Sequence, residues 1–162
     1  GLAFGTGTHP TTFMCLQWLD KNDVSGKTVV DYGCGSGILG VAALLLGAKQ
    51  ARGVDNDPQA LIATRDNTQR NQLPDESFEV FMPGKLEGTQ ADLMLANILA
   101  GPLIDLAETI TALVKPEGQL VLSGILQHQA SEVVKAYTPW FDFDEPATQE
   151  EWVCLTAVKK RD

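Results

Sequence analysis

Apolar, β-branched runs alternate with helical patterns along most of the chain, which is typical of a parallel sheet with crossover helices. Buried strands are predicted at residues 28–32, 51–54, 78–82, 91–96 and 119–123. Helices are predicted at residues 38–46, 58–70 and 102–114. Two of these helices carry boundary signals, since Gly47 suits a C-terminal stop and Asp57-Pro58 suits an N-cap followed by proline.

The end of the chain departs from this alternation. Residues 115–118 read as a turn, and a polar helix is predicted over residues 129–137. Two strands then follow without a helix between them, at residues 141–144 and 152–158. Consecutive strands with a short link usually pair antiparallel, so we expect the sheet to contain one reversed strand.

A glycine-rich loop stands where the first strand turns into a helix. It carries Gly33, Gly35 and Gly37, and glycines there let the backbone bend sharply and approach a ligand closely. The following helix start supplies free N–H donors and a positive dipole end. Asp55 follows the second strand, where a carboxylate can accept hydrogen bonds from both hydroxyls of a ribose. Together these residues predict an adenosine-bearing ligand across the carboxyl ends of the strands.

The choice of adenosine ligand stays open at this point. Gly35-Ser-Gly37-Ile-Leu-Gly40 satisfies the dinucleotide pattern G-x-G-x-x-G, so a nicotinamide-dependent oxidoreductase is one alternative. Asp31, just before the glycines, would repel a pyrophosphate and instead suits a ligand with a cationic or amino group near the loop. The antiparallel end of the chain also differs from a second mononucleotide-binding half.

Asp31-x-Gly33-x-Gly35-x-Gly37 with Asp55 resembles the motifs of class I S-adenosylmethionine-dependent methyltransferases. The resemblance implies a Rossmann-like α/β fold with helices on both faces of a seven-stranded, mostly parallel sheet. The implied strand order is 3-2-1-4-5-7-6 with strand seven antiparallel. We expect residues 1–162 to form one such catalytic domain.

Four segments resemble a narrower family, the methyltransferases of large-subunit ribosomal protein eleven. They are residues 3–12 (AFGTGTHPTT), 31–37 (DYGCGSG), 96–99 (ANIL) and 123–125 (SGI). This resemblance implies methyl transfer to lysine ε-amines, an N-terminal α-amine, or both, of a basic ribosomal protein. Another protein or a small-molecule amine stays an alternative acceptor. Because the chain opens with Gly1 rather than Met, we expect an N-terminal substrate-recognition domain before it in the parent protein.

The resemblance also assigns residues to S-adenosylmethionine, the implied cofactor. The implied cofactor-binding positions are Phe4, Gly5, Thr6, Thr12, Gly33, Gly35, Asp55, Gly84, Leu86 and Asn97. Independently, Pro10 suits a first helical position, which puts Thr12 near a helix N-terminus able to receive the methionine carboxylate.

Asn97 is the expected catalytic residue, because the resemblance places it facing the transferable methyl. Many amide and amine methyltransferases carry Asn/Asp-Pro-Pro-Tyr there, and Asn97-Ile-Leu-Ala100 departs from that pattern, which disfavours glutamine or DNA-base methylation. Neither histidine of the chain, His9 or His128, is a strong general-base candidate.

The net charge and the cysteines restrict the classes of binding partner and the cellular compartment that we expect. Twelve Lys and Arg against 21 Asp and Glu give a formal net charge of −9, which favours a basic partner and argues against direct nucleic-acid binding. The three cysteines are far apart and match neither a disulfide framework nor zinc-ligand spacing, so we expect reduced thiols, a cytoplasmic location and no metal. We expect no membrane association, because no apolar run approaches the roughly 20 residues of a membrane span.

Overall fold

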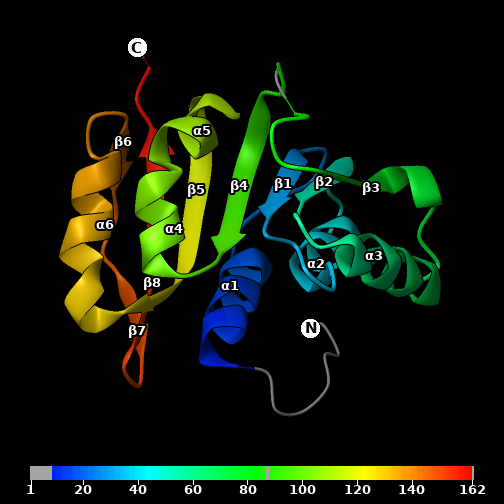
Figure 1. Cartoon of the computed structure of the whole chain (residues 1–162), viewed down its shortest axis with the longest axis horizontal. Helices are drawn as coiled ribbons and strands as arrows, with labels where there is room; N and C mark the ends of the chain where they lie inside the picture. The colour runs from blue at the N-terminus through cyan, green and yellow to red at the C-terminus, as the bar shows by residue number, and fades with distance from the viewer. Residues whose placement is uncertain (1–8, 87, 162) are drawn as a thin grey trace.

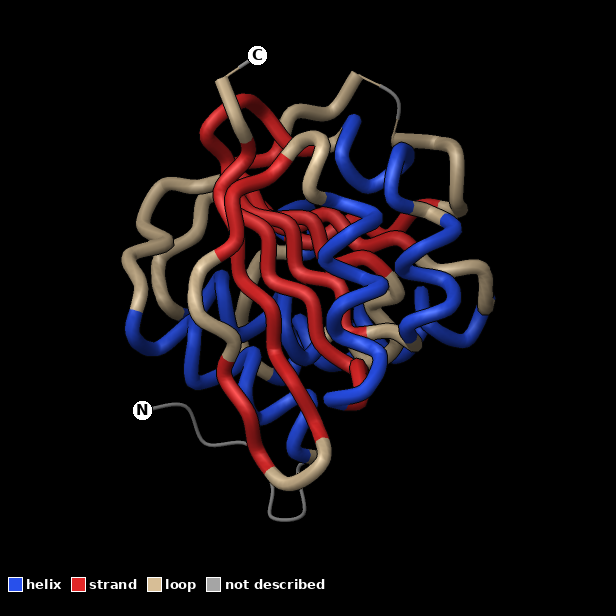
Figure 2. The backbone as a smooth tube through the Cα atoms, turned by 90° about the vertical axis from the view of Figure 1, so that its left-hand side faces the viewer, coloured by secondary structure: helices blue, strands red, loops and turns tan. Residues whose placement is uncertain are grey.

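One twisted sheet with helices on both faces forms the described part of the chain (Figures 1 and 2). The computed structural model describes residues 9–86 and 88–161. The helices are α1 (Pro10–Lys21), α2 (Ile38–Leu45), α3 (Pro58–Arg70), η1 (Asp75–Ser77), α4 (Ala100–Asp105), α5 (Ala107–Ala112), η2 (Gln127–Gln129) and α6 (Ala130–Tyr137). The strands are β1 (Thr28–Tyr32), β2 (Gln50–Val54), β3 (Phe78–Phe81), β4 (Ala91–Asn97), β5 (Val114–Leu126), β6 (Phe141–Phe143), β7 (Ala147–Gln149) and β8 (Trp152–Lys159).

The strand order confirms the predicted topology. The sheet runs β3-β2-β1-β4-β5-β8-β6, and β7 also pairs with β8. Strands β1 to β5 pair in parallel, whereas β8 is antiparallel to β5, β6 and β7. The chain moves outward from β1 to β3 and then returns to β4, so β1 and β4 flank the point where a ligand crevice forms in open α/β sheets.

Strand β7 was not predicted, and it shares one sheet edge with β6. Phe143 of β6 pairs with Ala157, and Ala147 of β7 pairs with Cys154, further along the same strand β8. Pro146 lies in the break between them and has no N–H to donate to the ladder. The two short strands therefore occupy the single edge position that the sequence assigned to one strand.

The prediction of one continuous helix over residues 102–114 is wrong, because the structure has two shorter helices that end at Ala112. The structure has α4 and α5, separated at Leu106, whose backbone (φ −97°, ψ 11°) leaves the helical range. Strand β5 begins at Val114, which pairs with Ala91, earlier than the predicted residue 119. The register then shifts before Leu93 pairs with Gln119, so the predicted turn at residues 115–118 survives as an irregularity within β5.

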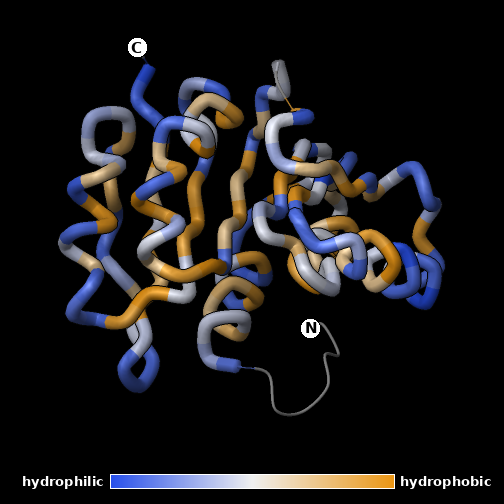
Figure 3. Tube along the Cα trace, in the orientation of Figure 1, coloured by the Kyte–Doolittle hydropathy of each residue, from blue (hydrophilic) through white to orange (hydrophobic). Residues whose placement is uncertain are grey.

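Alternating residues of the strands supply two cores on opposite faces of the sheet. Val29, Leu93 and Val121 pack on the side of α1 and α2. On the other side, the cluster under α4, α5 and α6 includes Val30, Met94, Leu120, Leu122, Leu103, Ile110 and Val133. Most of the central strands are accordingly hydrophobic along their length (Figure 3), as expected for strands covered on both faces.

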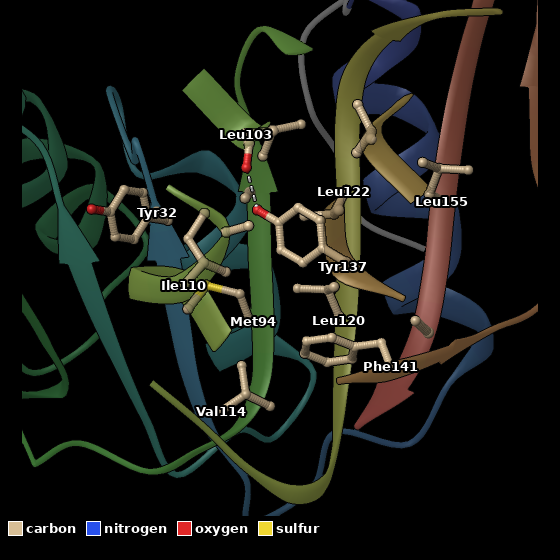
Figure 4. Close-up of a cluster of buried hydrophobic side chains, with 14 of the residues drawn as sticks. Tyr32, Met94, Leu103, Ile110, Val114, Leu120, Leu122, Tyr137, Phe141 and Leu155 are labelled. Atoms are coloured by element: carbon tan, nitrogen blue, oxygen red, sulfur yellow. Dashed lines mark hydrogen bonds between the residues drawn. The ribbon is translucent and has the colours of Figure 1, made fainter. Parts of the chain in front are cut away.

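A buried tyrosine reaches α4 from the end of α6 (Figure 4). Tyr137 is fully buried, and its hydroxyl donates a 2.7 Å hydrogen bond to the Leu103 carbonyl. Its ring also contacts Phe141, with ring centroids 6.1 Å apart. The hydroxyl thus gives the Leu103 carbonyl a donor just before the helix is interrupted.

We expect Tyr137→Phe to lower the free energy of unfolding by about 1–2 kcal/mol, because it leaves the buried Leu103 carbonyl without its donor. Urea denaturation of both proteins measures this difference. Tyr32→Phe is the matched control, since the Tyr32 hydroxyl points away from this cluster (Figure 4), and its effect should stay within about 0.5 kcal/mol. Equal stability of Tyr137→Phe and the unaltered protein would contradict this role.

Candidate functional site

The glycine-rich loop between β1 and α2 is fixed by main-chain contacts to β2. The N–H groups of Gly33 and Cys34 both donate to the Val54 carbonyl, at 2.7 and 3.1 Å. Gly33 has φ +74°, and a Cβ there would lie 2.5 Å from Ile98 Cγ2. Gly35 has φ +54°, and a Cβ there would meet nothing within 4 Å. The loop therefore packs tightly against Ile98 at Gly33 and is open at Gly35.

Asp55 lies beside this loop, as its spacing predicted. One carboxylate oxygen accepts from the Gly35 N–H at 2.9 Å, and the other accepts from the Asp57 N–H at 2.9 Å. Each carboxylate oxygen has a further lone pair for a ligand donor. Asp57 in turn caps α3 by accepting from the Gln59 N–H, which confirms the predicted helix start.

A hollow of about 310 Å³ brings Gly33 and Asp55 together. Its walls are Tyr32, Gly33, Val54, Asp55, Asn56, Pro83, Ile98 and Leu106. Of these walls only Gly33 and Asp55 were predicted as site residues, whereas the other six were not. For Asn56 a signal was available, since it directly follows Asp55. Leu106 reaches the hollow only through the packing of the break between α4 and α5.

Gly84 and Leu86 lie in an adjoining hollow of about 360 Å³. Its other walls are Tyr32, Val54, Gly88, Thr109, Ala112 and Leu113. Tyr32 and Val54 line both hollows, so the predicted adenine-end residues adjoin the space beside Asp55. Leu86 is also part of the hydrophobic core and is 4% exposed, which limits it to an apolar wall.

Thr12 and Asn97, 85 positions apart, are joined by a hydrogen bond. Asn97 ends β4, and its Nδ2 donates to Thr12 Oγ1 at 3.1 Å. Thr12 lies in the first turn of α1, which begins at Pro10 as predicted. Both residues therefore meet at the carboxyl edge of the sheet, next to the N-terminus of a helix.

His9 is the N-cap of α1. Its Nδ1 accepts from the Thr11 N–H at 3.3 Å and lies 2.9 Å from Thr11 Oγ1. The ring stands edge-on to Trp152, with centroids 5.0 Å apart. This capping contact occupies the nitrogen that a general base would need, so the geometry favours a structural role for His9.

A third hollow, of about 370 Å³, lies on the Asn97 side of Ile98. Its walls are His9, Thr11, Asn97, Ile98, Leu99, Gly124 and Trp152. Ile98 lines both this hollow and the one beside Asp55, so the two hollows adjoin at this residue. Trp152 and Gly124 were not predicted as lining residues, because only the pairing of β8 with β5 and of β5 with β4 brings them to Asn97.

The Asp31 carboxylate is buried against α2, whereas its place before the glycines suggested that it would lie near a cationic or amino group of the ligand. Asp31 is 2% exposed, and its carboxylate accepts from the Gly40 N–H of α2 at 3.1 Å. Burial raises the pKa of Asp31 to about 7, although the Gly40 hydrogen bond opposes this shift. Asp31 lines none of the three hollows, so its direct effect is to hold α2 against β1.

Three of the predicted cofactor-binding residues, Phe4, Gly5 and Thr6, fall outside the described residues. Among the described residues, no three or more His, Cys, Asp or Glu side chains are grouped as metal ligands would be. No helix within residues 9–86 and 88–161 has the length and hydropathy of a membrane span.

Known proteins are similar to this chain in sequence and in fold. The family model for ribosomal protein L11 methyltransferase (PrmA) matches residues 1–160. A relative from Cellvibrio japonicus (strain Ueda107), named ribosomal protein L11 methyltransferase, is 63% identical over 161 residues, which are 99% of this chain and 55% of the relative. The chain therefore spans about half the length of the curated relatives it matches.

Two solved structures extend the comparison to three dimensions. The crystal structure of ribosomal protein L11 methylase from Lactobacillus delbrueckii subsp. bulgaricus has a TM-score of 0.86 and 30% identity, covering 95% of this chain and 81% of that one. An RNA methyltransferase from Salinibacter ruber, in complex with S-adenosyl-L-homocysteine, has a TM-score of 0.72 at 15% identity, covering 99% of this chain and 95% of that one. The second likeness shows the fold alone. The match over nearly all residues and the shared fold agree: the chain belongs to the ribosomal protein L11 methyltransferase (PrmA) family.

Proposed function

We propose that this chain is the catalytic domain of an S-adenosylmethionine-dependent protein N-methyltransferase. Its acceptors are lysine ε-amines, an N-terminal α-amine, or both, of a large-subunit ribosomal protein, and the names of the relatives point to L11. One observation carries this proposal: a hollow beside Asp55 and a hollow beside Asn97 adjoin at Ile98, which lines both. A nucleoside in one hollow and an amine in the other would bring their reacting atoms together beside Ile98.

The residues present fit S-adenosylmethionine. Gly35 leaves open space beside the loop, and the free lone pairs of Asp55 suit the two ribose hydroxyls. We assign the base to the hollow bounded by Asn56 and Pro83, with Gly84 and Leu86 in the adjoining hollow. Thr12, in the first turn of α1, would receive the methionine carboxylate at the positive end of the helix.

When bound, S-adenosylmethionine supplies an electrophilic methyl group on a sulfonium. The chain's task is to hold a neutral amine in line with that methyl, so that the N–C bond forms as the C–S bond breaks. Asn97 Nδ2 is committed to Thr12, which leaves Oδ1 to accept a hydrogen bond from the amine and direct its lone pair. The methylated ammonium then loses its proton to water.

The pKa of the acceptor amine sets the fraction of acceptor molecules that are neutral and able to react. A lysine with a pKa of about 10.4 is neutral in only about one molecule in 2,500 at pH 7, whereas an α-amine of pKa about 7.7–8.0 is neutral far more often. Ile98, Leu99 and Trp152 give the Asn97 hollow apolar walls. Such walls disfavour the charged ammonium and so lower its pKa.

The charge of the chain suits a basic acceptor protein. Its formal net charge of −9 attracts a basic ribosomal protein and disfavours direct contact with nucleic acid. The relatives are nearly twice as long as this chain, so we assign most of the substrate recognition to the remainder of the full-length protein. Cys15, Cys34 and Cys154 are free, buried thiols, which fits the cytoplasm as the compartment.

We expect Asp55→Ala to weaken S-adenosylhomocysteine binding by about 1.5–3 kcal/mol, or about 10- to 150-fold in Kd, because a charged acceptor of two hydroxyls is lost. Isothermal titration calorimetry measures this change. Asp66→Ala, which removes an exposed carboxylate of α3, is the matched control for charge and should bind normally. Unchanged affinity in Asp55→Ala would remove Asp55 from the site, and preferential binding of NAD would point to an oxidoreductase.

The rate of methyl transfer should rise with pH, and the shape of the rise should identify the amine. With chemistry rate-limiting and the acceptor far below saturation, where the pKa of the free amine governs, a lysine acceptor gives about a tenfold increase per pH unit between pH 7 and 9, because its neutral fraction increases in proportion. An α-amine instead levels off above about pH 8. Single-turnover transfer of radiolabelled methyl groups to peptides carrying either amine measures both profiles. A flat profile with chemistry shown to be rate-limiting would contradict transfer that depends on bulk water as the proton acceptor.

The 162-residue chain alone should bind S-adenosylhomocysteine within about threefold of the full-length protein and should methylate intact ribosomal protein much more slowly. The physical reason is that tethered recognition raises the effective concentration of the acceptor at the site. Calorimetry and radiolabelled methyl transfer, run on both proteins, test the two halves of this expectation. Equal activity of the short chain on intact ribosomal protein would show that recognition lies within these residues.

A further inference from the structure

Ser123 and Gly124 form an irregularity at the end of β5, directly beside Asn97. Ser123 is the pairing partner of Asn97 across β4 and β5. On the other side of β5, the pairing with β8 shifts register between Leu122 and Ile125, so Ser123 and Gly124 lie within the shift. An irregularity of this kind bends the strand and redirects its side chains. Both residues belong to the segment 123–125 that carries part of the family resemblance, and the resemblance assigns neither of them a role.

Ser123 ties the start of α1 to the sheet. Its side chain is fully buried, and its hydroxyl donates to the Thr11 carbonyl at 2.8 Å. Asn97, on the neighbouring strand, donates to the hydroxyl of the next residue, Thr12. Two adjacent strand ends therefore hold two consecutive residues of the same helical turn. Loss of the Ser123 contact would release the Thr11 carbonyl and loosen the turn that orients Asn97.

Gly124 leaves space beside the other end of the Asn97 amide. Its φ is +88°, and a Cβ there would lie 2.4 Å from the Ile98 carbonyl oxygen and 3.2 Å from Asn97 Oδ1. Gly124 lines the same hollow as Asn97, Leu99 and Trp152. A side chain at position 124 would therefore displace the Asn97–Ile98 segment and crowd the oxygen that the proposed function gives to the acceptor amine.

We propose that Ser123 and Gly124 are positioning residues for methyl transfer. Ser123 holds the first turn of α1 so that Thr12 fixes Nδ2 of Asn97, and Gly124 keeps the Oδ1 side of the same amide open to the acceptor amine. Neither residue touches the reacting atoms; both act through Asn97. This inference rests on the proposed function, because it takes Asn97 Oδ1 as the group that receives the amine.

The two substitutions should differ in what they change. In the full-length protein, we expect Ser123→Ala to raise the Kd for S-adenosylhomocysteine about 3- to 10-fold and to lower kcat about 10-fold, because Thr12 and Asn97 both lose their support. Gly124→Ala should leave that Kd within about threefold and lower kcat at least 50-fold, with a smaller change in KM. Two matched controls share the chemistry but lie elsewhere and should behave as the unaltered protein. They are Ser77→Ala, whose hydroxyl donates to the Pro74 carbonyl, and Gly26→Ala, whose φ is +72° with nothing within 4 Å.

A double-mutant cycle with Asn97→Ala separates positioning from general destabilisation. If Ser123 acts through the Asn97 amide, Ser123→Ala should lower kcat less than threefold in the Asn97→Ala background, and Gly124→Ala should lower kcat clearly less there than in the unaltered protein, because only its contact with Ile98 remains. Fold-losses that multiply, or a Ser123→Ala protein with unchanged Kd and kcat, would overturn the proposal. Thermal unfolding identifies a variant that fails to fold, and if Gly124→Ala fails, the Ser123→Ala cycle decides. If the unaltered protein transfers no methyl group, the proposed function fails, while the Kd of Ser123→Ala still tests the support of α1.

Discussion

The contact between Gly33 and Ile98 determines how the site is divided. Gly33 is the first residue after β1, and the absence of a Cβ there lets the Ile98 side chain lie against the loop. Ile98 follows β4, the strand beside β1 at the point where the chain reverses its path through the sheet. The Asp55 hollow and the Asn97 hollow therefore adjoin at one apolar side chain, which lines both. On the proposed function, cofactor and acceptor occupy separate hollows and their reacting atoms meet beside Ile98.

Main-chain groups build most of the polar part of this site. The Asp55 carboxylate is oriented by the N–H groups of Gly35 and Asp57, and α1 presents its first turn through a cap at His9. Such contacts are set by the backbone and do not depend on long, flexible side chains. The buried Asp31, with its pKa raised to about 7, holds α2 behind the loop without adding a full negative charge at neutral pH. The geometry around the ligand is consequently fixed by the fold itself.

Features that depend on local sequence were predicted from the residues, and the strand order was expected from the family resemblance, whereas details that depend on particular distant contacts were not predicted. The bounds of β1 and α3 follow from an apolar run and from a cap with proline, and both match the structure. The break at Leu106 carries no proline or glycine that would announce it, and β7 depends on its register with β8. In the site, Asp55 was found through its distance from the glycines, whereas Trp152 reaches the Asn97 hollow only through the reversed strand β8. Pairing between strands is a property of the whole sheet, and no local pattern encodes it.

The apolar walls around Asn97 explain how an amine could react without a general base. On the proposed function, removal of an amine proton before the reaction requires only that the neutral form be favoured in the pocket, and the apolar side chains of Ile98, Leu99 and Trp152 favour it. A carboxylate in the same place would stabilise the ammonium and work against the reaction. Leu99 is 68% exposed at the mouth of the hollow, where it could cover the aliphatic stem of a lysine and cost little while the site is empty. The departure from Asn/Asp-Pro-Pro-Tyr to Asn-Ile-Leu thus fits an acceptor that is long, aliphatic and charged only at its tip.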